Sequence, residues 1–91
     1  MVSRKLKIIN ESGLQMQPAG SLCREAMKFN SFITLEFNGV KANAKSVLSV
    51  LGACVGPGDE IELSCEGEDE NEALEHLSGV IESGFKIPQV Q

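Results

Sequence analysis

The chain has 91 residues, of which 42% are hydrophobic and 23% are charged, and its formal net charge is −5. This length suits one small domain, and the composition is typical of a folded globular protein rather than a disordered one. No apolar run approaches the roughly 18 residues of a membrane span, and residues 1–5 lack the apolar core of a signal peptide. We therefore expect a cytoplasmic protein with no membrane partner.

The charge is unevenly distributed along the chain. Residues 1–45 carry seven Lys or Arg and three Asp or Glu. Residues 46–91 carry one Lys or Arg and ten Asp or Glu. The acidic residues of the second half are typical of solvent-exposed helix and strand faces. The alternative is an acidic surface that attracts a binding partner. The aromatic residues are four Phe, and no basic stripe accompanies them, so direct nucleic-acid binding is not expected.

The first half of the chain predicts a strand, a helix and a hairpin. Lysine alternates with apolar residues over 5–8, which indicates a strand with one buried face. After a short turn, apolar residues recur at helical spacing and predict a helix over about 17–28. Residues 32–37 alternate as a strand does, and the Asn38-Gly39 pair that follows is typical of a tight hairpin into a third strand.

The second half predicts two helices and one more strand. Ser46 precedes a short apolar run, so its hydroxyl is expected to cap a helix of about two turns that Gly52 ends. Residues 60–66 alternate between acidic or polar and apolar side chains, which predicts a strand. Asp69 is expected to cap the last helix, which is amphipathic and ends at Gly84.

The three cysteines, Cys23, Cys54 and Cys65, contain no CxxC pair. Since each lies among apolar neighbours, we expect buried free thiols. A metal site that combines them with the single His76 is the alternative, although zinc ligands usually come in close local pairs. No metal and no cofactor is expected.

The order β-α-β-β-α-β-α predicts an α+β fold. A four-stranded antiparallel sheet with one polar face and helices packed on the other is the economical arrangement, an open-faced β-sandwich. Ferredoxin-like domains share this order of elements, so the order alone does not define a function.

Local motifs go further than the order of elements. They are SGLQMQPAG at 12–20, FNG at 37–39, NAKSVL at 43–48, GDE at 58–60 and GEDE at 67–70. With these motifs the chain resembles the phosphocarrier protein HPr over about residues 2–84. The resemblance implies a single HPr-like domain over 1–91, with a core at 2–84 and a tail at 85–91.

The resemblance places the family's phosphohistidine at Gln15 and its arginine at Gln17. An amide nitrogen has a delocalised lone pair, whereas a neutral imidazole has a free one, so Gln15 cannot accept phosphate as His does. Gln17 lacks the planar fork of donors that an arginine offers to a phosphate. The helix start could hold an anion weakly or be a helix start alone. His76 has acidic neighbours and is expected to be a helix-face residue. No catalytic residue is therefore expected.

Ser46 matches the serine that an ATP-dependent kinase/phosphorylase modifies in Gram-positive relatives of HPr, where the phosphoprotein binds a transcriptional repressor. The resemblance therefore implies regulatory phosphorylation at Ser46. A helix N-cap is compatible with this role, because added negative charge lies at the positive end of the helix. The expected partners are a serine kinase/phosphorylase of the HPr type and a repressor or other regulatory protein.

The resemblance also implies a partner-binding surface. In HPr the side chains that match Val47, Leu48 and Leu51 form an exposed apolar patch that binds enzyme I and the repressor, whereas apolar residues of a short helix otherwise belong to the core. Met16 and Gly20 are expected to join this surface. A subgroup of the family, the catabolite-repression HPr-like regulators, also has Gln at position 15 and retains Ser46, but it keeps the Arg that Gln17 replaces here.

Three functions follow from these observations. The leading hypothesis is a non-catalytic signalling protein of carbon catabolite control, switched at Ser46 and read by a protein partner. The second is an ordinary phosphocarrier of the sugar phosphotransferase system. The third is a diverged interaction domain that is not phosphorylated.

Overall fold

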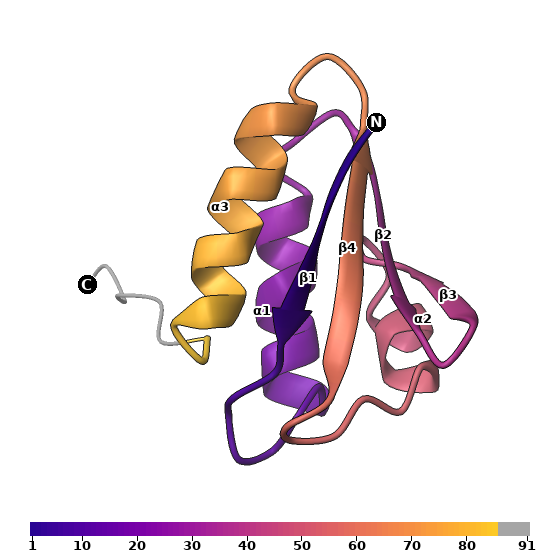
Figure 1. Ribbon diagram of the computed structural model, residues 1–91, viewed down its shortest axis with the longest axis vertical. Helices are drawn as coiled ribbons and strands as arrows, with labels where there is room; N and C mark the ends of the chain where they lie inside the picture. Colours follow the sequence, from indigo (N-terminus) through magenta and orange to yellow (C-terminus); the bar gives the residue numbers. More distant parts are fainter. Residues whose placement is uncertain (86–91) are drawn as a thin grey trace.

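A computed structural model describes residues 1–85, which form one sheet covered on one face by helices (Figure 1). The elements follow the predicted order: β1 (Val2–Lys7), α1 (Met16–Ala26), β2 (Phe32–Phe37), β3 (Val40–Asn43), α2 (Val47–Gly52), β4 (Glu60–Glu66) and α3 (Glu70–Glu82). The α+β open-faced sandwich is thus confirmed. None of the helices within residues 1–85 is long and apolar enough to cross a bilayer.

The sheet has the strand order β1-β4-β2-β3, and all neighbouring strands are antiparallel. Its open face carries charged residues in one cross-strand row, in which Lys5 pairs with Glu62, Glu62 with Glu36, and Glu36 with Lys41. Opposite charges directly across strands stabilise a sheet, and like charges do the reverse. The two lysines therefore flank a central carboxylate pair on the solvated face.

The core lies between the sheet and the helices. Apolar residues of the inner strand faces meet the buried stripes of the helices, and the largest fully buried side chains include Ile8, Leu22, Ile33, Leu35, Ile61, Leu63, Leu77 and Ile81. The alternation read from the sequence therefore assigns the correct strand faces. α1 packs against both α2 and α3, so it is the central helix of the layer.

The hairpin turn and the end of α2 agree with the sequence predictions, whereas the bounds of α1 differ from them. Asn38 and Gly39 have φ of 53° and 77°, the two positive values that a type I′ hairpin requires. Gly52 is the last residue of α2, as the sequence predicts, although its φ is not positive. The residue at positive φ is Cys54, with φ of 56°, and its N–H donates to the Leu51 carbonyl at 3.1 Å. α1 begins at Met16 and ends at Ala26, earlier than the expected 17–28.

Asp69 occupies the N-cap position of α3, but its side chain does not cap the helix. Its carboxylate instead accepts hydrogen bonds from the N–H groups of Asn30 and Ser31, at 2.8 and 2.9 Å, and from the Ser31 hydroxyl. These bonds lower the pKa of Asp69, with the Ser31 hydroxyl as the largest cause. Asp69 thus ties the start of α3 to the loop before β2.

The end of α3 follows the prediction. Gly84 has φ of 71°, its N–H donates to Ile81, and the N–H of Phe85 donates to Val80. These are the two bonds of a Schellman motif. Phe85 packs against the core, and the other residues of the expected tail, 86–91, lie outside the described part of the chain.

The prediction of three buried cysteines is wrong for two of them. Cys65 is buried, Cys23 is half-buried and Cys54 is exposed, and all three are free thiols. Burial raises the pKa of the Cys65 thiol. Cys54 is exposed because it follows the last turn of α2 in the left-handed region, a backbone feature that local hydrophobicity does not reveal.

Candidate functional site

The loop before α1 is fixed by Gly13. A Cβ at this position would lie 2.7 Å from the Val55 carbonyl oxygen, and φ is +63°, so only glycine fits. The N–H of the next residue, Leu14, donates to that same carbonyl at 3.0 Å. The loop therefore packs tightly against residues 55–56 and delivers Gln15 to the N-cap of α1 at the surface.

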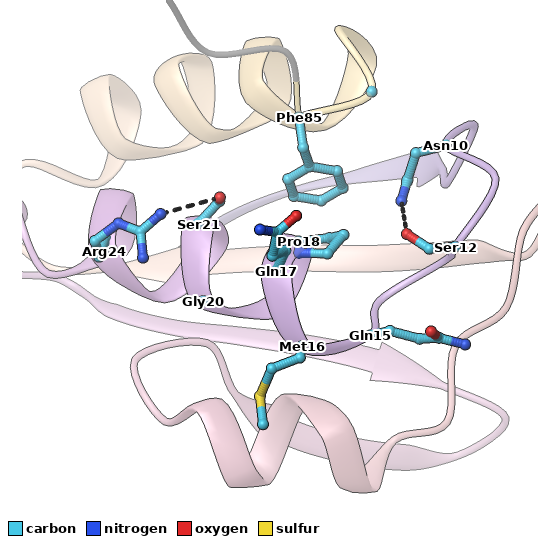
Figure 2. A pocket seen from close by; sticks show the side chains of 11 residues that line it. Asn10, Ser12, Gln15, Met16, Gln17, Pro18, Gly20, Ser21, Arg24 and Phe85 are labelled. Carbon is cyan, nitrogen blue, oxygen red and sulfur yellow. Dashed lines mark hydrogen bonds between the residues drawn. The ribbon is translucent and has the colours of Figure 1, made fainter. Parts of the chain in front are cut away.

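Gln15 is exposed, and its side chain makes no capping hydrogen bond. Met16 follows with 68% of its surface exposed, and it points toward α2 in Figure 2. Gln17 is exposed on the same first turn and lies near Pro18 and Phe85. The start of α1 thus presents two amides and one thioether to the solvent.

A groove of about 920 Å³ runs along this side of α1. It is lined by Asn10, Ser12, Gln15, Met16, Gln17, Pro18, Gly20, Ser21, Arg24, Gly84 and Phe85 (Figure 2). The lining contains no His, Cys, Asp or Glu, so it offers no general base that could activate the Ser12 or Ser21 hydroxyl as a nucleophile. Amides, hydroxyls and one guanidinium can bind a ligand by hydrogen bonds, but they do not accept a phosphoryl group as an imidazole does.

Ser46 caps α2 as the sequence predicts. Its hydroxyl accepts a hydrogen bond from the N–H of Ser49 at 3.3 Å, and its own N–H donates to the Asn43 carbonyl at 3.0 Å. The side chain of Ser49 turns back and accepts from the N–H of Asn43 at 2.9 Å. Ser46 is half-buried at the end of the helix, and the strand β3 ends three residues before it.

Lys45 is held in place by both its side chain and its backbone. Its ammonium donates to the Phe29 carbonyl oxygen at 2.6 Å, and its own carbonyl accepts from the Cys23 thiol at 3.0 Å. Both partners belong to α1 or to the turn directly after it. These two contacts, which the sequence does not signal, anchor the residue before Ser46 to the central helix.

The residues of α2 divide into buried and exposed ones. Val50 is fully buried, Val47 and Leu51 are half-buried and pack against the core, and Leu48 is 82% exposed. We call the surface formed by Met16, Gly20, Val47, Leu48 and Leu51 the helix-end patch. Leu48 and Met16 are its most exposed apolar side chains.

Sequence reasoning missed one residue that extends this surface. Met27 lies at helical spacing from Met16, Gly20 and Cys23 along α1, and 63% of its surface is exposed. The sequence predicts a helix over about 17–28, in which Met27 has the helical spacing of a buried residue. α1 ends at Ala26, however, so Met27 stands at the C-cap outside the core.

His76 lies away from the groove, on α3, and its position on a helix face agrees with the prediction. Its Nε2 lies 2.6 Å from Oε1 of Glu25, and its ring lies 5.5 Å from that of Phe29. Glu25 also accepts from Lys28 at 2.9 Å. The hydrogen bond with His76 is the main cause that lowers the pKa of Glu25, and it joins α1 to α3.

No group of three or more His, Cys, Asp or Glu side chains in the described residues, 1–85, is arranged to hold a metal ion. The thiols of Cys23 and Cys54 instead lie against backbone carbonyls, those of Lys45 and Gly52.

The four-stranded sheet, its covering helices and the two adjoining helix ends define a small α+β protein of the open-faced sandwich class. Residues 2–83 match the family model PTS-HPr, described as the PTS HPr component phosphorylation site. The HPr-like protein Crh of Bacillus subtilis (strain 168) is 40% identical over 82 residues, which cover 90% of this chain and 96% of that protein. The chain therefore belongs to the PTS-HPr family.

Solved structures agree with this assignment. HPr-C-His from Thermoanaerobacter tengcongensis superposes with a TM-score of 0.92 at 37% identity, covering 98% of this chain and all of the other. The crystal structure of Crh from Bacillus subtilis, described as a swapped dimer, gives a TM-score of 0.75 at 38% identity with the same coverage.

Proposed function

We propose that this chain is a non-catalytic HPr-like signalling protein of carbon catabolite control, switched by kinase-dependent phosphorylation of Ser46. The observation that carries the proposal is the pairing of two features. Gln15 stands at the exposed N-cap of α1, where the family resemblance implies the phosphohistidine. Ser46 stands at the N-cap of α2, next to the exposed Leu48.

Phosphate on Ser46 is expected to preserve α2. The modification adds about −1.5 to −2 charges, and negative charge at a helix N-terminus is stabilising by typically about 0.3–1 kcal/mol. The ammonium of the adjacent Lys45 donates to the Phe29 carbonyl, and its positive charge also favours a phosphate on Ser46. The phosphate oxygens can pair in addition with cationic groups of a partner, and charge-assisted hydrogen bonds of this kind are stronger than neutral ones.

The helix-end patch supplies the apolar part of the same contact. Leu48 and Met16 are largely exposed, so a partner that covers them gains hydrophobic area beside the new charge. The partners we propose are a serine kinase/phosphorylase of the HPr type and a transcriptional repressor or other regulatory protein. Binding to the surface of enzyme I is a further possibility that the same patch supports.

A phosphocarrier of the sugar phosphotransferase system is the second candidate, because the match to the family model favours it. The two candidates differ in which residue takes phosphate and from which donor. One sample is incubated with phosphoenolpyruvate and enzyme I, another with ATP and the serine kinase, and the intact mass is measured in each. We expect one acid-stable phosphate from ATP, none from phosphoenolpyruvate, and no labelling of Ser46→Ala.

An acid-labile phosphate on the wild type in the first sample would establish the carrier function instead. No phosphate in either sample would leave the diverged interaction domain. As a positive control, Gln15→His combined with Gln17→Arg is expected to gain some transfer from enzyme I. A folded but inert double variant would show that the helix-end patch no longer binds enzyme I.

A further inference from the structure

A large aromatic side chain lies exposed on the open face of the sheet. Phe32, the first residue of β2, has 80% of its surface exposed, whereas the next residue, Ile33, is buried in the core. The helices cover only the other face of the sheet (Figure 1). The ring of Phe32 therefore offers apolar surface on the side of the molecule opposite to the helices.

A carboxylate lies beside this ring. Glu66 on β4 is directly opposite Phe32 in the antiparallel register, and it is exposed on the same face. The Cβ atoms of such a pair lie about 4.5–5.5 Å apart. The ion pairs found within residues 1–85 involve other carboxylates; the ammonium of Met1, for example, pairs with Glu70 at 3.3 Å. An aromatic ring and a carboxylate without an ion-pair partner in the described residues are thus adjacent.

This combination of groups suits a guanidinium. The face of an aromatic ring attracts a cation. A planar guanidinium can stack on the ring while its N–H groups donate two parallel hydrogen bonds to a carboxylate. An ammonium is a more strongly hydrated point charge and cannot stack in this way. Phe32 and Glu66 together should therefore favour arginine over lysine, and both over a neutral side chain.

The shape of the surface favours a protein over a small molecule. Sites for small molecules are concave, but Phe32 and Glu66 line neither the groove beside α1 nor the cavity of about 200 Å³ near the β2–β3 hairpin. The surrounding charge also attracts cations, because residues 46–91 carry ten Asp or Glu and one Lys or Arg. An arginine that projects from a polypeptide can reach such an open surface.

We propose that the open face of the sheet binds an arginine-bearing segment of a protein partner, with the guanidinium stacked on Phe32 and paired with Glu66. This contact goes beyond the proposed function, because it lies on the face opposite to the helices and does not involve Ser46. The protein thus has a second interaction surface, and its chemistry selects for a cation.

The test uses the peptide acetyl-Ala-Arg-Ala-amide and two counterparts in which lysine or citrulline, the neutral analogue of arginine, replaces the arginine. Each is titrated into the ¹⁵N-labelled protein at low ionic strength, and the backbone amide signals and the ring signals of Phe32 are followed. We expect shifts at residues 31–34 and 64–67. The affinity for the arginine peptide should be about fivefold higher than for the citrulline peptide, the factor that about 1 kcal/mol provides, with the lysine peptide between them.

Two variants assign the preference to the two groups. Phe32→Leu keeps an apolar side chain without the ring, and it should remove the preference for arginine over lysine. Glu66→Gln keeps the shape without the charge, and it should lower the preference for arginine over citrulline to about twofold or less. Glu60→Gln is the matched control, because it removes the same charge from the same face at the other end of β4 and should leave both preferences unchanged.

Equal affinity for the arginine and citrulline peptides, or no shifts at residues 31–34 and 64–67, would overturn the proposal. An equal loss of preference in Glu60→Gln would also overturn it, since the attraction would then come from the general negative charge of the chain. Shifts that grow with protein concentration alone would assign this face to a second copy instead. The titration uses unmodified protein, so its outcome is independent of whether Ser46 is phosphorylated.

Discussion

Two neighbouring positions of α2 are expected to separate folding from recognition. Leu48 is 82% exposed, whereas Val50 is fully buried. Complete burial of a large aliphatic side chain is worth about 1.5–3 kcal/mol, so Leu48 gains only about a fifth of that, roughly 0.3–0.6 kcal/mol. Leu48→Ala should therefore lower the free energy of unfolding by less than about 0.5 kcal/mol, since alanine also has the higher helix propensity.

Val50→Ala removes two buried methyl groups and leaves a cavity. The transfer cost is about 0.8 kcal/mol per methyl-sized group. The cavity that remains because the site collapses only in part adds to this cost, so a loss of about 2–3 kcal/mol is expected. Urea denaturation of both variants measures these free energies. In parallel, kcat/KM for ATP-dependent labelling of Ser46 should fall severalfold for Leu48→Ala and remain near the wild-type value for Val50→Ala under conditions in which it is folded.

The opposite pattern would refute this reasoning. If Leu48→Ala destabilises the protein by more than about 1.5 kcal/mol, the exposed side chain has a structural role. If its labelling by the kinase is unchanged, the kinase does not contact the helix-end patch. A labelling defect confined to folded Val50→Ala would place recognition in the core side of α2 and contradict the assignment of the patch.

Three further predictions concern the rest of the fold. The pKa of Glu25 is lowered in the folded state, chiefly by its bond to His76; this bond therefore stabilises the protein above the unfolded pKa of about 4.5, and the contribution is lost as pH falls through the folded pKa. Glu25→Gln should lower the free energy of unfolding by about 1–2 kcal/mol at pH 6 and weaken the dependence of that free energy on pH below neutrality. Urea denaturation at several pH values measures both effects. An unchanged pH dependence in the acid range would contradict the role of this bond. Gly79 lies exposed within α3, and no atom lies within 4 Å of a Cβ added there. Gly79→Ala should therefore raise the free energy of unfolding by about 0.5–1 kcal/mol, and with it the melting temperature. A lower melting temperature would show that the added methyl group disturbs a contact. With a thiol-specific reagent, Cys54 should react rapidly and Cys65 only on unfolding, because Cys65 is buried and its pKa is raised; equal rates in the folded protein would disprove this.

The sequence predicts the fold well where periodicity and burial coincide. The alternation of β4, with Ile61, Leu63 and Cys65 inward, and the hairpin signal at Asn38-Gly39 are both confirmed. These features are local, because the period of side chains and the need for positive φ are properties of a few adjacent residues. Expectations that depend on contacts distant in sequence fare less well.

Asp69 illustrates this limit. A carboxylate before an acidic first turn suggests a helix cap, but the loop at residues 30–31 presents three donors to it instead. The same holds for the candidate site. The cap by Ser46 follows from sequence, whereas the anchoring of Lys45 to Phe29 and the groove around Arg24 arise from how α1 lies against its neighbours.

The central claim is that charge at Ser46 changes recognition while the fold remains. The most direct measurement compares amide NMR spectra of the ¹⁵N-labelled protein before and after ATP-dependent phosphorylation by the serine kinase. The account predicts shifts confined to about residues 44–52 and the adjoining loop before α1, because the cap of Ser46 remains formed and that loop contacts the segment after α2, where the Val55 carbonyl accepts from the Leu14 N–H. Shifts spread across β1 and β4, or loss of the helical signals of α2, would contradict it.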